Sequence, residues 1–387
     1  MRVAQVHVRY RQSGGEDAVV AHEAALLRAG GHSVTSVLLD NPSGASDTAR
    51  SLIKAPWNSS AARSVVAEVR RWRPDIVHVH NTWFALSTAV LEELRLSGLT
   101  TVLSVHNYRA SCINAVLLRD GRRCHDCVGR APWPGVVHRC YRGSALASTA
   151  AAAAVLTARR RRAWAAPDAV VLVGGHVRGF AAASGFDPDR LHEVPHSVPD
   201  LGHRRSRPSS SDELLYVGRL STEKGLAQLV DAWRTADVPG LRLVIVGDGP
   251  LRPDLERNLP TNVRLLGGVS STEVHRRMSE ARALVVPSVW DEMYGLVVAE
   301  AFCAGTPVLA SDRAGPRELI VAAGLQSWLV GDDHWRRALN DLANGHLADG
   351  ADAAGAQARR YYEATLTPER GLTRLVGVYE RAASASR

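Results

Sequence analysis

Short apolar segments alternate with helix-like segments twice along this 387-residue chain. The first series runs from residues 2–8 to residues 190–194, and the second begins at residues 213–217. Alternation of this kind is typical of parallel sheets whose crossover helices cover both faces. The sequence therefore predicts an α/β protein built from two doubly wound domains.

Residues 199–212 separate the two series, and their prolines and consecutive serines are typical of a linker. We expect an N-terminal domain over residues 1–198, a C-terminal domain over residues 213–366 and a last helical segment over residues 367–387. An irregular insertion rich in cysteine and arginine, residues 106–142, interrupts the first series.

Local patterns give finer expectations for the first domain. Residues 41–60 form a polar stretch before the next helix, and another helix is predicted from Thr82 or Phe84 to Leu96. Ser144 is the expected N-cap of an alanine-rich helix, because its hydroxyl can accept a hydrogen bond from a backbone N–H group that the helix leaves unpaired.

The net charge of +8 is concentrated in one part of the chain, because residues 101–162 contain eleven arginines against Asp120 and Asp126. Such a surplus can face an anionic acceptor, a membrane surface or nucleic acid, although a solvated arginine surface is the commoner outcome. The N-terminal residues lack the apolar run of a signal peptide, and residues 150–156 are too few to span a bilayer. We therefore expect a soluble, cytoplasmic protein. Peripheral association with the inner face of a membrane is the alternative location.

Two glutamates in residues 287–318 form the most informative motif. Seven residues separate Glu292 from Glu300. A short apolar strand precedes Glu292 and a buried helix follows, so Glu292 falls on a strand-to-helix loop and Glu300 falls within the helix. Such loops lie at the carboxyl ends of parallel strands, where ligands bind, and the N–H groups of residues 293–296 would form an anion site.

This stretch closely resembles the Glu-x7-Glu signature of retaining glycosyltransferases of family four, and the resemblance covers most of the chain. It implies the GT-B fold, in which two Rossmann-like domains face one another across a cleft and the last helix crosses back to the first domain. By the same resemblance, Glu292 would contact the hydroxyls of the donor sugar and Glu300 the ribose of its nucleotide. Glutamates favoured at a helix start by the helix dipole are the alternative explanation.

Other loops resemble the donor-binding parts of the same family. One corresponds to an N-terminal glycine loop that faces the donor phosphate, and another to a phosphate-binding loop in which an arginine and a lysine could both reach a diphosphate. Cations paired with acidic neighbours at the surface are the alternative for these two residues. The donor-binding residues implied by the resemblance are Gly14, Gly15, Arg219, Lys224, Gly247, Val269, Met293, Tyr294, Gly295, Leu296 and Glu300.

A histidine follows the strand predicted at residues 100–105. The family places a histidine at this point against the donor sugar, so the resemblance implies His106 and Glu292 as catalytic residues. Nothing local in the sequence fixes the proton state of His106. His78 and His80 alternate along one strand and are interpreted as buried structural residues or as lining of the cleft.

Together, these matches predict a retaining hexosyltransferase that uses a UDP- or GDP-type nucleotide sugar and needs no metal for catalysis. The acceptor could be a glycan, a lipid-linked sugar or a natural product. Residues 194–198 and Gly174–Gly175 depart from the family's usual Pro-Asn-Gly and serine. Two other interpretations remain: a nucleotide-sugar epimerase or sugar phosphorylase of the same fold, and a zinc-supported nucleic-acid-binding protein, which the few interleaved aromatic residues do not favour.

Four cysteines lie in one arginine-rich segment with the spacing Cys-x11-Cys-x2-Cys-x12-Cys: Cys112, Cys124, Cys127 and Cys140. Two thiolates of a Cys-x2-Cys pair can bind one tetrahedral ion. The longer segments on either side can bring the other two cysteines to the same ion. A cytoplasmic compartment disfavours a disulfide. A structural zinc is therefore weighed against reduced structural thiols and against a redox pair at the central two cysteines.

Overall fold

The computed structural model describes residues 1–10, 14–204, 206–347 and 350–385. Contacts between residues divide the chain into two compact units. The first unit contains residues 1–117, residues 124–196 and the chain from residue 369 onward. The second unit contains residues 118–123 and 197–368.

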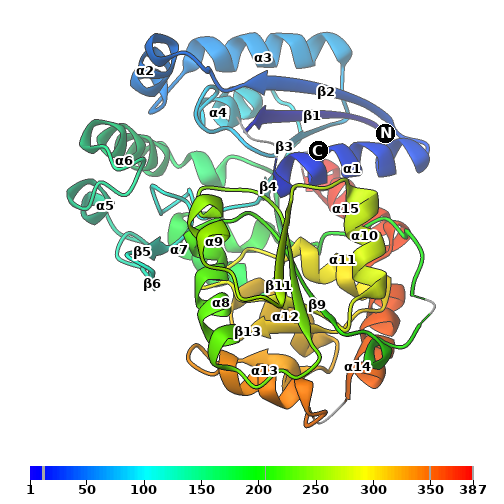
Figure 1. Ribbon diagram of the computed structural model, residues 1–387. Helices are drawn as coiled ribbons and strands as arrows, with labels where there is room; N and C mark the ends of the chain where they lie inside the picture. The colour runs from blue at the N-terminus through cyan, green and yellow to red at the C-terminus, as the bar shows by residue number, and fades with distance from the viewer. Residues whose placement is uncertain (11–13, 205, 348–349, 386–387) are drawn as a thin grey trace. The chain divides into compact units, whose positions relative to one another are not determined.

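The first unit is built on a six-stranded parallel sheet in the order β2-β1-β3-β4-β7-β8 (Figure 1). Its strands are β1 (Arg2–Arg9), β2 (Ser33–Asp40), β3 (Ile76–Val79), β4 (Thr101–Val105), β7 (Ala169–Leu172) and β8 (Leu191–Glu193). All residues of β3, β4 and β7 are buried, as expected for central strands of a sheet covered on both faces.

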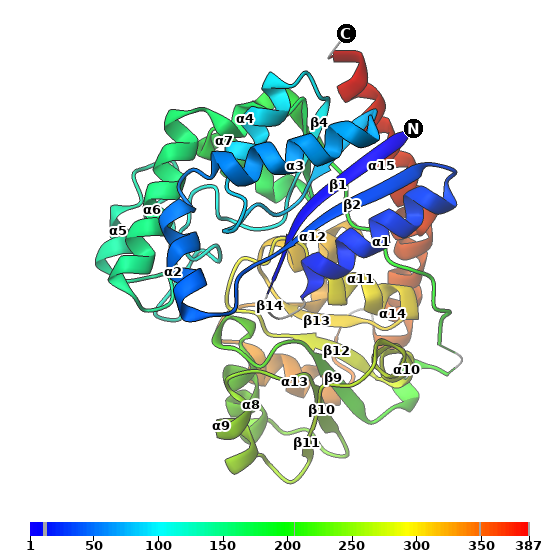
Figure 2. The same cartoon turned by 90° about the horizontal axis from the view of Figure 1, so that it is seen from above.

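The helices of the first unit come from both ends of the chain. They are α1 (Gly15–Ala29), α2 (Ala45–Lys54), α3 (Ser59–Trp72), α4 (Ala89–Leu96), α5 (Trp133–Val137), α6 (Ala145–Arg160), α7 (Arg178–Ser184) and α15 (Pro368–Ala385). Leu375, Val378 and Tyr379 of α15 join a core with Val3 and Ile76 of the sheet, and Figures 1 and 2 both show this C-terminal helix beside α1. The last helix therefore completes the core of the first unit.

The second unit contains a six-stranded parallel sheet in the order β11-β10-β9-β12-β13-β14. Its strands are β9 (Glu213–Val217), β10 (Arg242–Val246), β11 (Val263–Gly267), β12 (Ala283–Val286), β13 (Val308–Ser311) and β14 (Leu329–Val330). Its helices are α8 (Leu226–Thr235), α9 (Arg252–Arg257), α10 (Ser271–Glu280), α11 (Leu296–Ala304), α12 (Ala314–Ala322), α13 (Trp335–Ala343) and α14 (Gly350–Tyr361), which a π-helical turn (Tyr362–Leu366) continues. The prediction of two doubly wound α/β domains is thus confirmed.

Two local predictions differ from the structure. The helix expected from Thr82 or Phe84 begins only at Ala89, because side-chain amides hold the preceding backbone outside a helix. The Asn81 carboxamide oxygen accepts a hydrogen bond from the Trp83 N–H group at 3.0 Å, and the Asn58 side chain donates one to the Ala85 carbonyl at 2.8 Å. The polar stretch at residues 41–60 contains α2, whereas the Ser144 cap is confirmed by its bond from the Ala147 N–H group.

The insertion is largely irregular but contains a short antiparallel hairpin, β5 (Leu118–Arg119) and β6 (Arg122–Arg123). Arg159 of α6 holds this segment, because its guanidinium donates to the Ser111 hydroxyl at 2.7 Å and to the Cys127 carbonyl at 3.3 Å. Among the helices of the described residues, none has the length and apolar character needed to cross a membrane.

Candidate functional site

The predicted site residues fall into two groups. Glu292, Glu300 and the cations of the phosphate-binding loop belong to the second unit, whereas His106, the Gly14–Gly15 loop and the four cysteines belong to the first.

A buried ion pair joins two loops of the second unit. Lys224 Nζ donates to Glu292 Oε1 at 2.8 Å, although 68 residues separate them, and the Ser288 hydroxyl donates to the same oxygen. The Glu292 side chain is only 7% exposed, so burial by itself raises the pKa of this carboxyl. The charge of Lys224 and the donated hydrogen bonds outweigh burial and hold the pKa below its usual value, so Glu292 is a carboxylate at neutral pH.

Arg219 lies in the same loop as Lys224 but has another partner. Its guanidinium donates to the Glu223 carboxylate and, at 3.2 Å, to the Ser221 hydroxyl. The Arg219 side chain is 56% exposed, so a bound anion can reach it without displacing a buried contact. Sequence reasoning did not assign Glu223 or Ser288 to the site, although Ser288 stands in the same motif as Glu292.

Glycines bring the loops of this site into backbone contact. A Cβ atom on Gly225, whose φ is +69°, would lie 1.8 Å from the Pro287 carbonyl oxygen. A Cβ atom on Gly247, whose φ is +139°, would lie 1.9 Å from the Gly218 carbonyl oxygen. Only glycine permits these approaches, and the first of them sets the loop of Lys224 against the loop of Glu292.

Replacing Gly225 by alanine should therefore destabilise the second unit and disturb the ion pair. The matched control is Gly240→Ala, because Gly240 has nearly the same φ of +71° but nothing within 4 Å of the added carbon. We expect Gly225→Ala to lose about 1–3 kcal/mol of unfolding free energy beyond the loss in the control. Chemical denaturation of both variants measures this difference, and equal losses would show that the loops can separate.

Four predicted donor residues surround the start of α11. Gly295 is its N-cap, with φ +89°, and Leu296 is its first residue. Met293 and Tyr294 are buried in the preceding loop, which the Gly315 N–H group fixes by donating to the Glu292 carbonyl at 2.9 Å.

Glu300 lies one turn into α11, and its side chain is exposed. The pKa of Glu300 is raised to about 7 because the surrounding protein disfavours its charged form, even though the side chain reaches solvent. Val269 lies beyond β11, directly before Ser270, the N-cap of α10.

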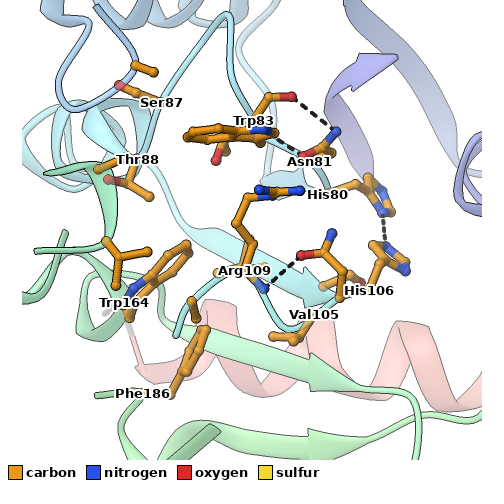
Figure 3. Close-up of a pocket in the computed structure, with 18 residues that line it drawn as sticks. His80, Asn81, Trp83, Ser87, Thr88, Val105, His106, Arg109, Trp164 and Phe186 are labelled. Carbon is orange, nitrogen blue, oxygen red and sulfur yellow. Dashed lines mark hydrogen bonds between the residues drawn. The ribbon is translucent and has the colours of Figure 1, made fainter. Parts of the chain in front are cut away.

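In the first unit, His106 is part of a row of histidine rings. Its imidazole stacks on His80 at 5.4 Å and on His196 at 5.6 Å between ring centroids. Its Nε2 atom lies 3.1 Å from Nδ1 of His80, the contact drawn in Figure 3. Burial, and then the neighbouring histidines, lower the pKa of His106 well below its usual value, so the structure supplies the neutral state that the sequence left open.

The glycine loop forms the start of α1. Gly14 is the N-cap of this helix, and its N–H group donates to Asp17 Oδ2 at 3.0 Å. Among the described residues, nothing lies within 4 Å of a Cβ placed on Gly14, so none of them constrains this position by packing. Burial raises the pKa of the adjacent Glu16 to about 7, and Glu16 accepts a hydrogen bond from the Tyr10 hydroxyl.

A cavity of about 70 Å³ opens beside His106. Figure 3 shows Arg109 among its lining residues, between Trp83 and Val105. The Arg109 guanidinium lies 4.6 Å from the centre of the Trp83 ring and donates to the Ile113 carbonyl at 2.9 Å. An arginine from the insertion therefore lines the cavity next to His106, a contact that composition alone could not predict.

The surplus of arginine has a partly structural role. Arg109 and Arg159 hold the insertion, and the Arg142 guanidinium lies 5.4 Å from the centre of the Tyr141 ring. These side chains are engaged within the first unit. The peripheral association with a membrane stays a prediction, carried by the remaining arginines.

The four cysteines lie in the same segment of the first unit and form no disulfide. Cys112 Sγ donates to Asn114 Oδ1 at 2.8 Å, and burial raises the pKa of the Cys127 thiol, with Cys112 and Cys124 near enough to contribute. Cys140 packs against the apolar cluster around Ile113. Within the described part of the chain, the set of three potential ligand atoms that lie within 4.8 Å of one another consists of Glu23, His78 and His80, and the cysteines form no such set.

Comparison with known families accounts for both halves of the chain. Residues 13–200 match the family model Glycosyltransferase Family 4, and residues 203–359 match the model Glycosyl transferases group 1. A curated relative, the 2-deoxystreptamine glucosyltransferase of Streptomyces kanamyceticus, is 30% identical over 275 residues. The match spans 67% of this chain and 65% of that protein's length.

Solved structures extend the likeness to the whole fold. Sucrose-phosphate synthase from Thermosynechococcus elongatus has a TM-score of 0.71 at 18% identity, with 99% of both chains covered. HepE from Anabaena, solved in complex with UDP, has a TM-score of 0.67 at 14% identity, with 97% of this chain and 99% of that chain covered. The expected GT-B class of fold is thereby confirmed.

Proposed function

We propose that this chain, whose two halves match glycosyltransferase models, is a family 4-type glycosyltransferase that transfers a sugar, with retention of configuration, from a nucleoside diphosphate sugar to an acceptor. The observation that carries this proposal is the buried pair of Lys224 and Glu292 beside the N-terminus of α11. It combines a fixed carboxylate, a cation and the backbone N–H groups of a helix start, which are the parts that a departing diphosphate and a cationic sugar require.

The diphosphate would bind at Lys224, Arg219 and the first N–H groups of α11. Negative charge grows on the leaving group as its bond to the sugar breaks, so these groups stabilise the transition state more than the ground state. Two side-chain cations would serve the purpose that a metal ion serves in other transferases, and we propose that catalysis needs no metal. Glu300, together with Gly247 and Val269 of the second unit, would bind the nucleoside.

The sugar would pass through a cationic state held by the Glu292 carboxylate. Lys224 keeps Glu292 ionised despite its burial, so a full negative charge is available. For His106 we propose a neutral imidazole that hydrogen-bonds the donor sugar, because its lowered pKa excludes a cation that would repel the reacting carbon. An oxygen of the departing phosphate would take the acceptor's proton on the face that it leaves, which retains the configuration and balances the proton.

As the donor substrate, we propose a hexose carried on uridine diphosphate. The relative named above is a glucosyltransferase, and a structural neighbour was solved with UDP. The acceptor would be a glycan, a lipid-linked sugar or a natural product.

Thermal unfolding in the presence of free nucleotides tests this proposal most directly. A nucleoside diphosphate at 100 times its Kd should stabilise the protein by about 2.7 kcal/mol, and UDP should raise the unfolding temperature more than GDP or ADP. A matching shift with UMP would argue against the diphosphate subsite. If no nucleoside diphosphate stabilises the protein, the transferase proposal fails. Conversion of the nucleotide sugar into its epimer without net release of UDP would instead favour an epimerase. Formation of a sugar 1-phosphate from a glycoside and inorganic phosphate would favour a phosphorylase.

A further inference from the structure

Three potential metal ligands converge in the interior of the first unit, away from the four cysteines. Glu23 lies on α1, and His78 and His80 lie on the same face of the chain at the end of β3, because strand residues two apart point the same way. Glu23 Oε2 lies 3.7 Å from His78 Nδ1 and 3.8 Å from His80 Nε2. The two histidine side chains are fully buried and the Glu23 side chain is 13% exposed.

These separations are too long for hydrogen bonds, and two of the atoms have no other partner. Glu23 Oε2 and His80 Nε2 are buried without a hydrogen bond among the described residues. Buried polar atoms nearly always have a hydrogen-bond partner. Two neighbouring buried atoms that lack one indicate that a water molecule or an ion lies between them. An ionised carboxylate in this interior needs a positive charge as its partner.

We propose that Glu23, His78 and His80 bind one divalent transition metal ion of the zinc type. Two imidazole nitrogens and one carboxylate oxygen are a donor set that such ions favour. Tetrahedral bonds of about 2.0–2.1 Å place ligand atoms about 3.3 Å apart. The two carboxylate–nitrogen separations exceed this value by about half an ångström, and the two nitrogens lie within 4.8 Å of one another.

The groups around this set fit the role of supporting partners. His78 Nε2 lies 2.8 Å from the Ser104 hydroxyl, which leaves Nδ1 as its lone-pair atom. The Tyr379 hydroxyl of α15 hydrogen-bonds that Nδ1 at 2.8 Å, and binding of the ion would replace this hydrogen bond. A metal-bound histidine commonly donates its other N–H group to a neighbour, and Nδ1 of His80 has such a neighbour in His106.

The ion would thereby position the predicted catalytic histidine. With Nε2 of His80 on the metal, the proton of His80 is on Nδ1 and is donated to Nε2 of His106. His106 must then carry its own proton on Nδ1 to remain neutral. Metal binding and the tautomer of His106 are coupled in this arrangement.

Metal content and X-ray absorption of the full-length protein test the proposal. Protein purified without chelator from zinc-supplemented medium should contain about one zinc per chain bound at about 2.0–2.1 Å by nitrogen and oxygen, whereas cysteine ligands would give distances of about 2.3 Å. The measurement is repeated on Cys124→Ser/Cys127→Ser, which removes the central thiols. Nitrogen and oxygen ligation that persists in this variant supports the site. Zinc bound only by sulfur, or protein that contains no zinc and takes up none on titration, overturns it.

Point variants locate the ion. Glu23→Gln keeps the shape of the side chain but removes its charge, and it should lose the zinc with nitrogen and oxygen ligands. His22→Gln is the matched control, because His22 precedes Glu23 on the same helix and does not belong to the set. Retention of this zinc in Glu23→Gln would overturn the assignment. If Glu23→Gln does not fold, the ligand distances in the wild-type protein still decide it.

Discussion

Replacing Glu292 by glutamine should lower kcat by about 100-fold or more while the affinity for free nucleoside diphosphate changes little. Glutamine keeps the shape of the side chain and can still accept hydrogen bonds from Lys224 and Ser288. It removes the full charge that would stabilise the cationic sugar, which exists only in the transition state. Steady-state kinetics with the donor identified by thermal unfolding, together with calorimetry of the free diphosphate, measures the two quantities separately.

Glu300→Gln provides the contrast for this experiment. Glu300 lies one turn into α11 with its side chain exposed, and its proposed partner is the ribose, so its loss should weaken nucleotide affinity more than it lowers kcat. Glu292→Gln should therefore lose mainly kcat, and Glu300→Gln should lose mainly nucleotide affinity. If both lose kcat and affinity to the same extent, the separate roles of the two glutamates are wrong.

Lys224→Met should impair both binding and chemistry, because it removes the cation at the diphosphate and the partner of Glu292. We expect diphosphate to lose its advantage over monophosphate in binding, and kcat/KM to fall by about 100-fold. Without Lys224, burial becomes the dominant influence and raises the pKa of Glu292. Glu292 then becomes protonated at a higher pH than in the wild-type protein. The acidic limb of the pH–kcat profile should therefore shift to higher pH.

The other lysine of the chain offers a matched control. Lys54 ends α2, is exposed and has no place in the proposed site, so Lys54→Met makes the same chemical change without its consequences. Unchanged diphosphate preference in Lys224→Met, or an equal loss in Lys54→Met, would contradict the proposed contact.

The fold was largely predictable because its main signal is local. Each strand and each crossover helix carries its own apolar pattern, and the parallel topology follows from their alternation. The start of α4 was not predictable in this way. It depends on Asn58 and Asn81, whose side chains bind backbone groups of residues 83–85, and a helical pattern in the sequence does not reveal such competition.

The candidate site was predictable in its parts but not in its charge states. The motifs located Glu292, Lys224 and Arg219, yet only the structure shows that Lys224 pairs with Glu292 across 68 residues. Arg219 is different, because its partner Glu223 is only four residues away and this pairing can be predicted from the sequence. The neutral state of His106 depends first on burial and then on His196, which the fold brings beside it from a distant part of the chain.

The C-terminal helix has a consequence for how this protein is made. Val378 and Tyr379 of α15 belong to the core around Val3 and Ile76, so the first unit lacks part of its interior until α15 has been synthesised. Nearly all of the second unit, residues 197–368, has been synthesised before that helix leaves the ribosome. Although domains usually fold in the order of their synthesis, here the unit that is begun first is completed last. Until α15 is available, the apolar face of the N-terminal sheet that it covers stays exposed in the nascent chain.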